Sequence, residues 1–228
     1  MKPKPLPEKA LKLGKNIIIA DVHLGYEIAM AKEGFYLPPR VFHDVVKSLK
    51  NLLEREKPKR LIINGDFKHS FVPEWREKTE LRAFLEEVSP LVSEVVLVRG
   101  GNHDVGILWL KELGVEIVDE LEIGKWKLVH GHKLVEGKNF IIGHEHPAIR
   151  LRDEVGAVIK VPIFLMGGNH LITLPAFSPW AYGNDVLREI VSPFLKYRRE
   201  DFKVLVPVDK EVLDFGTLSK LQEALKRL

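Results

Sequence analysis

Side chains that bind metal ions gather in five short segments of this chain. The segments are Asp21-Val22-His23, Gly65-Asp66 with His69, Gly101-Asn102-His103-Asp104, His130-Gly131-His132 and Gly143-His144-Glu145-His146. Each follows an apolar, β-branched run of the kind that forms a buried strand. In open α/β sheets, ligands sit beyond the carboxyl ends of the strands. We therefore expect five strand ends to bring Asp, Asn and His side chains to one metal site.

The residue types restrict which metals fit. The chain contains no cysteine, so the ligands must be oxygen atoms and imidazole nitrogens. That mixture favours Mn, Zn, Fe, Co or Ni over Ca or Mg alone, and Mn is our preferred candidate. Asp21 and His23 are two residues apart, so they would point the same way on an extended chain. His144 and His146 repeat this spacing.

The number of candidate ligands predicts two ions. The candidates are Asp21, His23, Asp66, Asn102, His130, His144 and His146. They exceed the needs of one ion, and Asp66 would bridge a pair. A water between two divalent ions is a hydroxide near neutral pH and can attack phosphorus. His103 would then protonate the leaving alkoxide, and Asp104 would orient the His103 imidazole.

The elements that must position these residues alternate between strands and helices in the first half of the chain. A helix beginning at Pro38-Pro39 carries an apolar stripe from Val41 to Leu53. A second helix is expected over about 73–91, with Trp75 on its buried side. A short third helix is expected over 106–113. This half is therefore predicted to be βαβαβ.

The second half is predicted to be mostly β. From Val115 to Met166, short strand-like runs alternate with Gly, Asn and Asp turns, and 175–199 forms a long loop. A strand pair from Lys203 to Phe215 precedes a C-terminal helix that begins at Thr217. The two halves together predict an α/β fold, in which two mixed β-sheets pack as a sandwich flanked by helices. We expect one domain spanning residues 1–228.

Composition limits the cellular setting. The 35 basic and 32 acidic residues leave a net charge of +3, which by itself does not argue for nucleic-acid binding. No apolar run approaches the length of a membrane span or signal sequence, so we expect a cytoplasmic protein that does not enter membranes. Abundant Lys and Glu, one glutamine and no cysteine are typical of thermophile proteins.

The motifs DxH, GD, GNHD, a middle His and GHxH, in that order, resemble those of the calcineurin-like metallophosphoesterases over about Ile17 to Pro147. The resemblance implies a dinuclear hydrolase of phosphate esters. It assigns one metal to Asp21, His23, Asp66 and His146. It assigns the second to Asp66, Asn102, His130 and His144. It also makes His103 the catalytic acid.

Three segments further resemble the SbcD-related archaeal phosphoesterases and the DNA-ligase-associated ones: 21–26, 34–38 and 65–69. That resemblance favours phosphodiesters over phosphomonoesters and implies a nuclease acting on DNA or RNA. The alternative is a small-molecule phosphodiesterase for cyclic nucleotides, or a nucleotidase. A catalytically silent binding scaffold is a third reading, and His103 argues against it. The double-strand-break repair nucleases that share these motifs usually have a longer C-terminal capping domain. Only about a third of this chain follows His146, so we do not expect double-strand-break repair activity.

Several residues around the motifs have less specific expectations. His69, His132 and Phe67 are expected to contact the substrate; the alternatives are that His69 lies behind the metal ligands, that His132 is merely packed and that Phe67 belongs to the core. Many family members carry an acidic residue where His69 stands. His130 and His132 compete for one metal position, for which the resemblance favours His130. An extra glycine, Gly100, precedes the usual one. The remaining histidines, His43 and His170, are expected to be structural, and a homodimer is compatible with the sequence.

Overall fold

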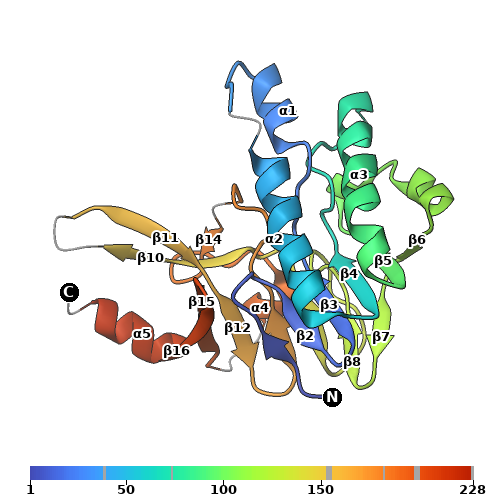
Figure 1. The fold of residues 1–228 in the computed structure, drawn as a ribbon. Coiled ribbons are helices and arrows are strands. Elements are labelled where there is room, and N and C mark those ends of the chain that lie inside the picture. The colour runs from blue at the N-terminus through green and yellow to red at the C-terminus, as the bar shows by residue number, and fades with distance from the viewer. Residues whose placement is uncertain (38–39, 73, 153–155, 182, 198–200, 227–228) are drawn as a thin grey trace.

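The computed structural model describes residues 1–37, 40–72, 74–152, 156–181, 183–197 and 201–226. Within them a six-stranded sheet runs in the order β1-β2-β3-β4-β5-β6 (Figure 1). Its strands are β1 (Lys4–Pro5), β2 (Leu11–Leu13), β3 (Asn16–Ile19), β4 (Arg60–Asn64), β5 (Glu94–Val98) and β6 (Val115–Val118). β3 to β6 are parallel, and β1 and β2 are antiparallel additions.

The second sheet has seven strands in the order β16-β15-β12-β13-β9-β8-β7. Its strands are β7 (Leu121–Ile123), β8 (Trp126–Leu128), β9 (Phe140–Ile142), β12 (Phe164–Gly167), β13 (Leu171–Thr173), β15 (Lys203–Val208) and β16 (Glu211–Thr217). β8, β9 and β13 are parallel, and the others pair antiparallel. Both sheets are therefore mixed, as the sequence predicts.

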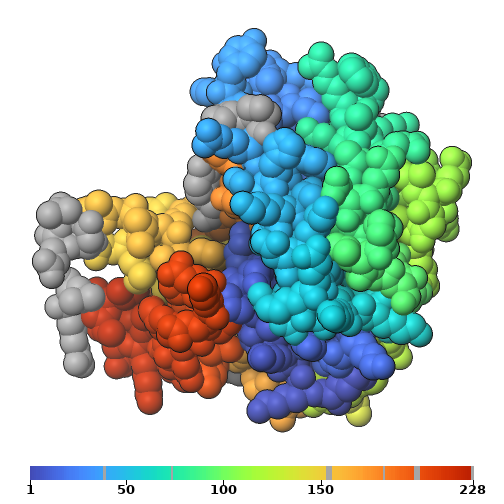
Figure 2. All heavy atoms as spheres, viewed as in Figure 1, coloured from blue at the N-terminus to red at the C-terminus, as the bar shows by residue number. Residues whose placement is uncertain are grey.

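A third, three-stranded sheet was not predicted. It consists of β10 (Pro147–Arg152), β11 (Val158–Pro162) and β14 (Asn184–Asp185). β10 and β11 form an antiparallel hairpin that extends away from the two main sheets (Figures 1 and 2). β10 begins directly after His146, so this sheet is anchored at the predicted site.

Two long helices cover the outer face of the six-stranded sheet (Figure 1). The predicted stripe is buried in α2 (Val41–Glu56), and the Pro38-Pro39 start signal lies outside the described residues. α3 (Trp75–Val88) confirms the second helix, but Trp75 is 70% exposed, so its predicted burial is wrong. Trp75 is the first residue of α3. The short helix α1 (Tyr26–Lys32), which has no buried residue, was missed.

The interface between the main sheets is entirely apolar at its centre. Ile18, Ile62 and Val96 of the first sheet pack against Leu128 and Ile141 of the second, and all are fully buried. Other buried clusters lie between the first sheet and α2 and α3, and between the second sheet and α4 (Pro193–Lys196) and α5 (Leu218–Leu225). The result is the predicted sandwich flanked by helices.

One buried amide joins the two sheets beside the strand ends that carry the motifs. Asn64, the last residue of β4, is fully buried. Its side-chain Nδ2 donates to the carbonyls of Val129 and Ile141, at 3.1 and 3.3 Å. Its own backbone carbonyl accepts from His130 Nδ1 at 3.1 Å. Asn64 therefore links the two sheets by hydrogen bonds at the strand ends where the metal-binding motifs begin.

Replacing Asn64 with Leu keeps the volume but removes the donor, leaving a buried carbonyl without its partner. We expect the free energy of unfolding to fall by about 1–3 kcal/mol. The measurement is urea unfolding in the presence of a chelator, so that metal binding does not contribute. The exposed Asn51→Ala substitution in α2 is the control. Equal stability of Asn64→Leu and the wild type would contradict this role.

Candidate metal centre

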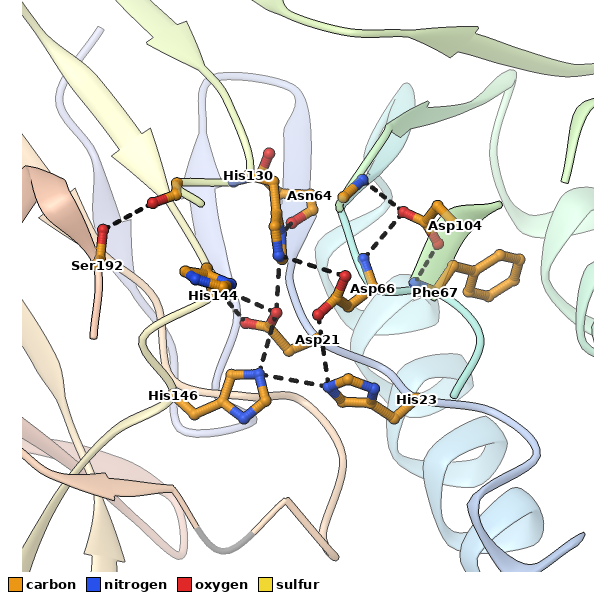
Figure 3. Close-up of polar contacts among 12 residues, drawn as sticks. Asp21, His23, Asn64, Asp66, Phe67, Asp104, His130, His144, His146 and Ser192 are labelled. Carbon is orange, nitrogen blue, oxygen red and sulfur yellow. Dashed lines mark hydrogen bonds and ion pairs between the residues drawn. The ribbon is translucent and has the colours of Figure 1, made fainter. Parts of the chain in front are cut away.

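The predicted ligands leave their strands in an unusual backbone conformation. Asp21, His23, Asp66, His144 and His146 all have positive φ angles, between 45° and 65°. Non-glycine residues seldom adopt this left-handed conformation, which costs about 1–3 kcal/mol and clusters at functional sites. The expectation that Asp21 and His23 align on an extended chain is therefore wrong. Sharp turns after the strands point their side chains toward one another (Figure 3).

A first group of ligand atoms comes from Asp21, His23, Asp66 and His146, all within 4.8 Å of one another. His23 Nε2 lies 3.3 Å from His146 Nε2, and His146 Nε2 lies 3.2 Å from Asp21 Oδ1. His23 Nε2 is 3.9 Å from Asp66 Oδ2. The Asp21 carboxylate also accepts the backbone N–H of His144. These are the four residues that the family resemblance assigns to one metal, and their role as ligands stays a prediction.

A second group consists of Asp66, His130 and His144. His130 Nδ1 donates to the carbonyl of Asn64, because a carbonyl oxygen can only accept. The proton on Nδ1 leaves Nε2 of a neutral His130 with a lone pair, and this atom lies 3.3 Å from Asp66 Oδ1. The Asp66 carboxylate thus belongs to both groups, with one oxygen facing each (Figure 3).

The histidines of the cluster have pKa values that are shifted in opposite directions. Burial opposes charge on His130, but contact with Asp66 and the negative charge of Asp21 outweigh it and raise the pKa of His130 to about 9. Burial lowers the pKa of His23 to about 3 and that of His144 to about 4, with neighbouring imidazoles adding to the effect. Burial also opposes ionisation of Asp66, yet its contact with His130 keeps the Asp66 pKa below the ordinary value.

These residues fit divalent metal ions. Buried His23 Nδ1 lacks a hydrogen-bond partner here, and Asp66 Oδ1 and His130 Nε2 have only each other, at 3.3 Å. Such atoms are costly unless they are paired or coordinate a metal. The Nε2 atoms of His23 and His146 also face each other, as two ligands of one ion would. A mixed carboxylate and imidazole set suits a borderline divalent cation.

Two glycines of the motifs make room for the ligands. A methyl group on Gly100 would lie 2.3 Å from Asp66 Oδ1, and one on Gly143 would lie 2.7 Å from Asp21 Oδ2. Both distances are shorter than any real contact, so larger residues would displace the carboxylates. The additional glycine Gly100 is therefore explained by its approach to Asp66.

Asn102 lies at the rim of the cluster. It is exposed and begins the 3₁₀ helix Asn102–Asp104. It lines a cleft of about 650 Å³ together with His130 and His132. The role of its amide oxygen as a ligand stays a prediction. The His132 ring centroid is 5.6 Å from that of His130, and substrate contact by His132 also stays a prediction.

His103 lies beside the first group of ligands. Its ring centroid is 4.8 Å from that of His23, and His23, His69 and His103 form a further cluster of ring nitrogens within 4.8 Å. His103 Nδ1 contacts the carbonyl of His69 and must be the donor. That contact fixes the ring orientation and leaves Nε2 available for a substrate.

The structure corrects the role expected for Asp104. Both Asp104 oxygens accept backbone N–H groups: those of Asp66 and Phe67 at 3.0 Å, and that of Gly100 at 2.5 Å. Asp104 is 4% exposed. The His69 carbonyl, rather than Asp104, orients His103. Asp104 instead fastens the turn that carries Asp66.

The expectation that Phe67 contacts substrate is wrong. Its side chain is fully buried and its ring lies 5.1 Å from that of Phe84 in α3. The backbone turns sharply after β4, so the side chain of Phe67 points into the core between the first sheet and the helices. His43 is exposed on α2, and His170 is exposed in the turn between β12 and β13, where Nδ1 contacts Asn139.

Two buried glutamates near the site were missed. Glu145, between His144 and His146, accepts from the backbone N–H groups of Val191 and Ser192 and from the Asn184 amide. Glu77 of α3 accepts the backbone N–H groups of His69 and Ser70. Both are 1% exposed. Glu145 was visible in sequence as the charged residue between two ligands, whereas Glu77 carried no local signal.

The sequence profile of the calcineurin-like phosphoesterase family matches residues 15–190, more than three quarters of the chain. The chain belongs to the calcineurin-like phosphoesterase family. It is therefore a metal-dependent hydrolase of phosphate esters. A search of curated proteins finds no match. None of the helices in the described part of the chain has the length and apolarity needed to cross a membrane.

A solved structure of low sequence identity shares the fold. Pseudomonas putida nuclease MPE is 21% identical, with a TM-score of 0.68, over 94% of this phosphoesterase and 99% of the nuclease. A protein of unknown function from Aquifex aeolicus, AQ665, is 23% identical, with a TM-score of 0.40, over 57% of this chain and 77% of that one.

Asp104→Asn separates the two roles considered for this residue. The substitution turns an N–H group toward backbone donors, so we expect a loss of about 1–3 kcal/mol in the free energy of unfolding, and weaker Mn binding. His103→Ala should retain normal stability and Mn affinity. Denaturant unfolding and metal titration provide the measurements. An Asp104→Asn protein with normal stability and metal content, but slow turnover, would restore the original assignment.

Proposed function

We propose that this phosphoesterase hydrolyses phosphodiester bonds with two divalent ions, preferably Mn, and that its substrate is nucleic acid. The position of Asp66 carries the proposal, because its two oxygens face different groups of imidazoles. In this proposal the first ion is held by Asp21, His23, Asp66 and His146. The second is held by Asp66, Asn102, His130 and His144.

The protein's own groups have separate tasks in the reaction. When bound, the two ions supply Lewis-acid stabilisation of the phosphoryl oxygens and lower the pKa of a nucleophilic water. His103, held by the His69 carbonyl, donates a proton to the leaving oxygen. The amides that Asp104 accepts keep the Asp66 turn rigid, so the carboxylate keeps its position between the two groups.

The surroundings of the site favour an anionic polymer over a small ester. The cleft beside Asn102 and His132 is also lined by Lys78, Arg99 and Lys133. Lys78 and Lys133 are exposed, whereas Arg99 is paired with Asp119. Cations along an open cleft attract a phosphate backbone. The structural likeness to a nuclease supports the same substrate class.

Two substitutions test the chemistry. We expect Asp66→Ala to lose both ions. His103→Ala should keep both but hydrolyse alkyl phosphodiesters about 10²- to 10⁴-fold more slowly, with a smaller loss on bis-p-nitrophenyl phosphate, whose leaving group needs no proton. Metal analysis and kinetics with Mn are the measurements, and the exposed His170→Ala is the matched control. Normal metal occupancy in Asp66→Ala would refute the bridging role.

A substrate panel tests the choice of nucleic acid. We expect single-stranded DNA to be hydrolysed with Mn at a higher kcat/KM than cyclic nucleotides or nucleoside monophosphates. Lys133→Ala should lower kcat/KM for DNA and reduce its salt dependence by about 0.7 in the log–log slope for each lost phosphate contact. Lys138→Ala is the control, because Lys138 is exposed on the same loop outside the cleft. Preference for cyclic nucleotides would favour the small-molecule alternative.

A further inference from the structure

A row of rings borders the metal centre at His23, whose ring centroid lies 5.4 Å from that of His69 and 4.8 Å from that of His103. Trp180 stacks on Tyr26 at 6.4 Å between centroids, and Tyr26 meets His69 at 4.8 Å. His69 lies 5.5 Å from His103, and His103 lies 4.4 Å from Phe71. The catalytic cluster therefore has an edge built of aromatic and imidazole faces, and Phe71 is at its outer end.

Phe71 is exposed although its neighbours are fixed. Its side chain is 60% exposed, and its ring is tilted by 50° against that of His103. The two residues before it are held by Glu77, which accepts the N–H groups of His69 at 3.1 Å and Ser70 at 2.8 Å. A buried carboxylate thus anchors the segment that presents an apolar ring to solvent. By contrast, the side chain of Phe67 in the same loop is fully buried.

The proposed reaction indicates which part of the substrate would lie on the Phe71 ring. In the proposed reaction His103 donates its proton to the leaving oxygen, so the group bonded to that oxygen must lie against His103. Phe71 is the exposed ring next to His103. In a nucleic acid the leaving oxygen belongs to a nucleoside, and its base is a flat π-system within reach of a ring beside the scissile bond. Stacking on an aromatic side chain is how proteins bind unpaired bases.

We propose that Phe71 is a base-stacking residue for the nucleotide that carries the leaving oxygen. This inference rests on the proposed function and narrows it to single-stranded substrates. In a duplex both faces of each base are covered by neighbouring pairs, so a base must leave the stack before Phe71 can contact it. In an unpaired strand, a base can contact Phe71 without first leaving a base pair. Phe71 therefore determines specificity, whereas His103 performs the proton transfer.

The test uses short single-stranded DNA with one cleavable linkage flanked by hydrolysis-resistant ones. An abasic sugar replaces the nucleoside on one side of that linkage or on the other, and the products identify the leaving side. We expect the wild type with Mn to lose about 5- to 150-fold in kcat/KM when the leaving nucleoside lacks its base. In Phe71→Ala this ratio should fall to near one, mainly through KM. Phe71→Tyr, which preserves stacking, should restore it.

Tyr197→Ala is the matched control, because Tyr197 is 77% exposed and lies outside the row of rings, and it should keep the wild-type ratio. A wild-type enzyme indifferent to the base, or Phe71→Ala retaining the full ratio, would overturn the stacking role and leave the proposed function intact. Hydrolysis of bis-p-nitrophenyl phosphate with no cleavage of any oligonucleotide would overturn both. Thermal unfolding of each variant confirms that it folds.

Discussion

The Asp66 carboxylate and the imidazole of His130 meet in a buried space where a positive charge between them is stabilising. His130 commits its Nδ1 proton to the Asn64 carbonyl, so a neutral ring turns a lone pair toward an Asp66 oxygen 3.3 Å away. Buried acceptors that face each other need a proton or a cation between them. Despite burial, contact with Asp66 raises the pKa of His130 to about 9, so the site favours positive charge at this position. The whole centre is arranged around positive charge that metal ions provide.

The rest of the structure holds the ligands in place. Asp104 accepts three backbone amides around the Asp66 turn, and Glu145 binds the segment at Val191 and Ser192 to the loop between His144 and His146. Strained backbone at the ligands persists because such contacts over-determine it. Rigid placement of the ligands before the substrate arrives is what catalysis by electrostatic stabilisation requires.

The sequence predicts the two groups of Asp and His side chains because their types and order follow buried apolar strands. Five strand ends, both mixed sheets and helices α2 and α3 agree with the hydrophobic patterns, which depend on short stretches of chain. The left-handed turns at Asp21 and Asp66 could not be predicted in this way. They depend on contacts with segments distant in the sequence, as do the hydrogen bonds of Asp104 and the third sheet.

Phe67 and Phe71 illustrate the same limit. They are four residues apart in an irregular loop that has no helical or strand period, so the sequence gives no signal about which of them is buried. The structure places Phe67 in the core and exposes Phe71 beside His103. Phe71, and not Phe67, is therefore accessible to a substrate. Glu77 holds the backbone between them by accepting the N–H groups of His69 and Ser70, and its position in α3 gives no local hint of that contact.

The most direct test of the account is to locate manganese by anomalous scattering in crystals of the protein grown with Mn. We expect two peaks on opposite sides of the Asp66 carboxylate, one near His23 and His146 and the other near His130 and His144. We infer two ions because each oxygen of Asp66 faces a different group of imidazoles. A single peak, or ions bound without contact to Asp66, would contradict the account.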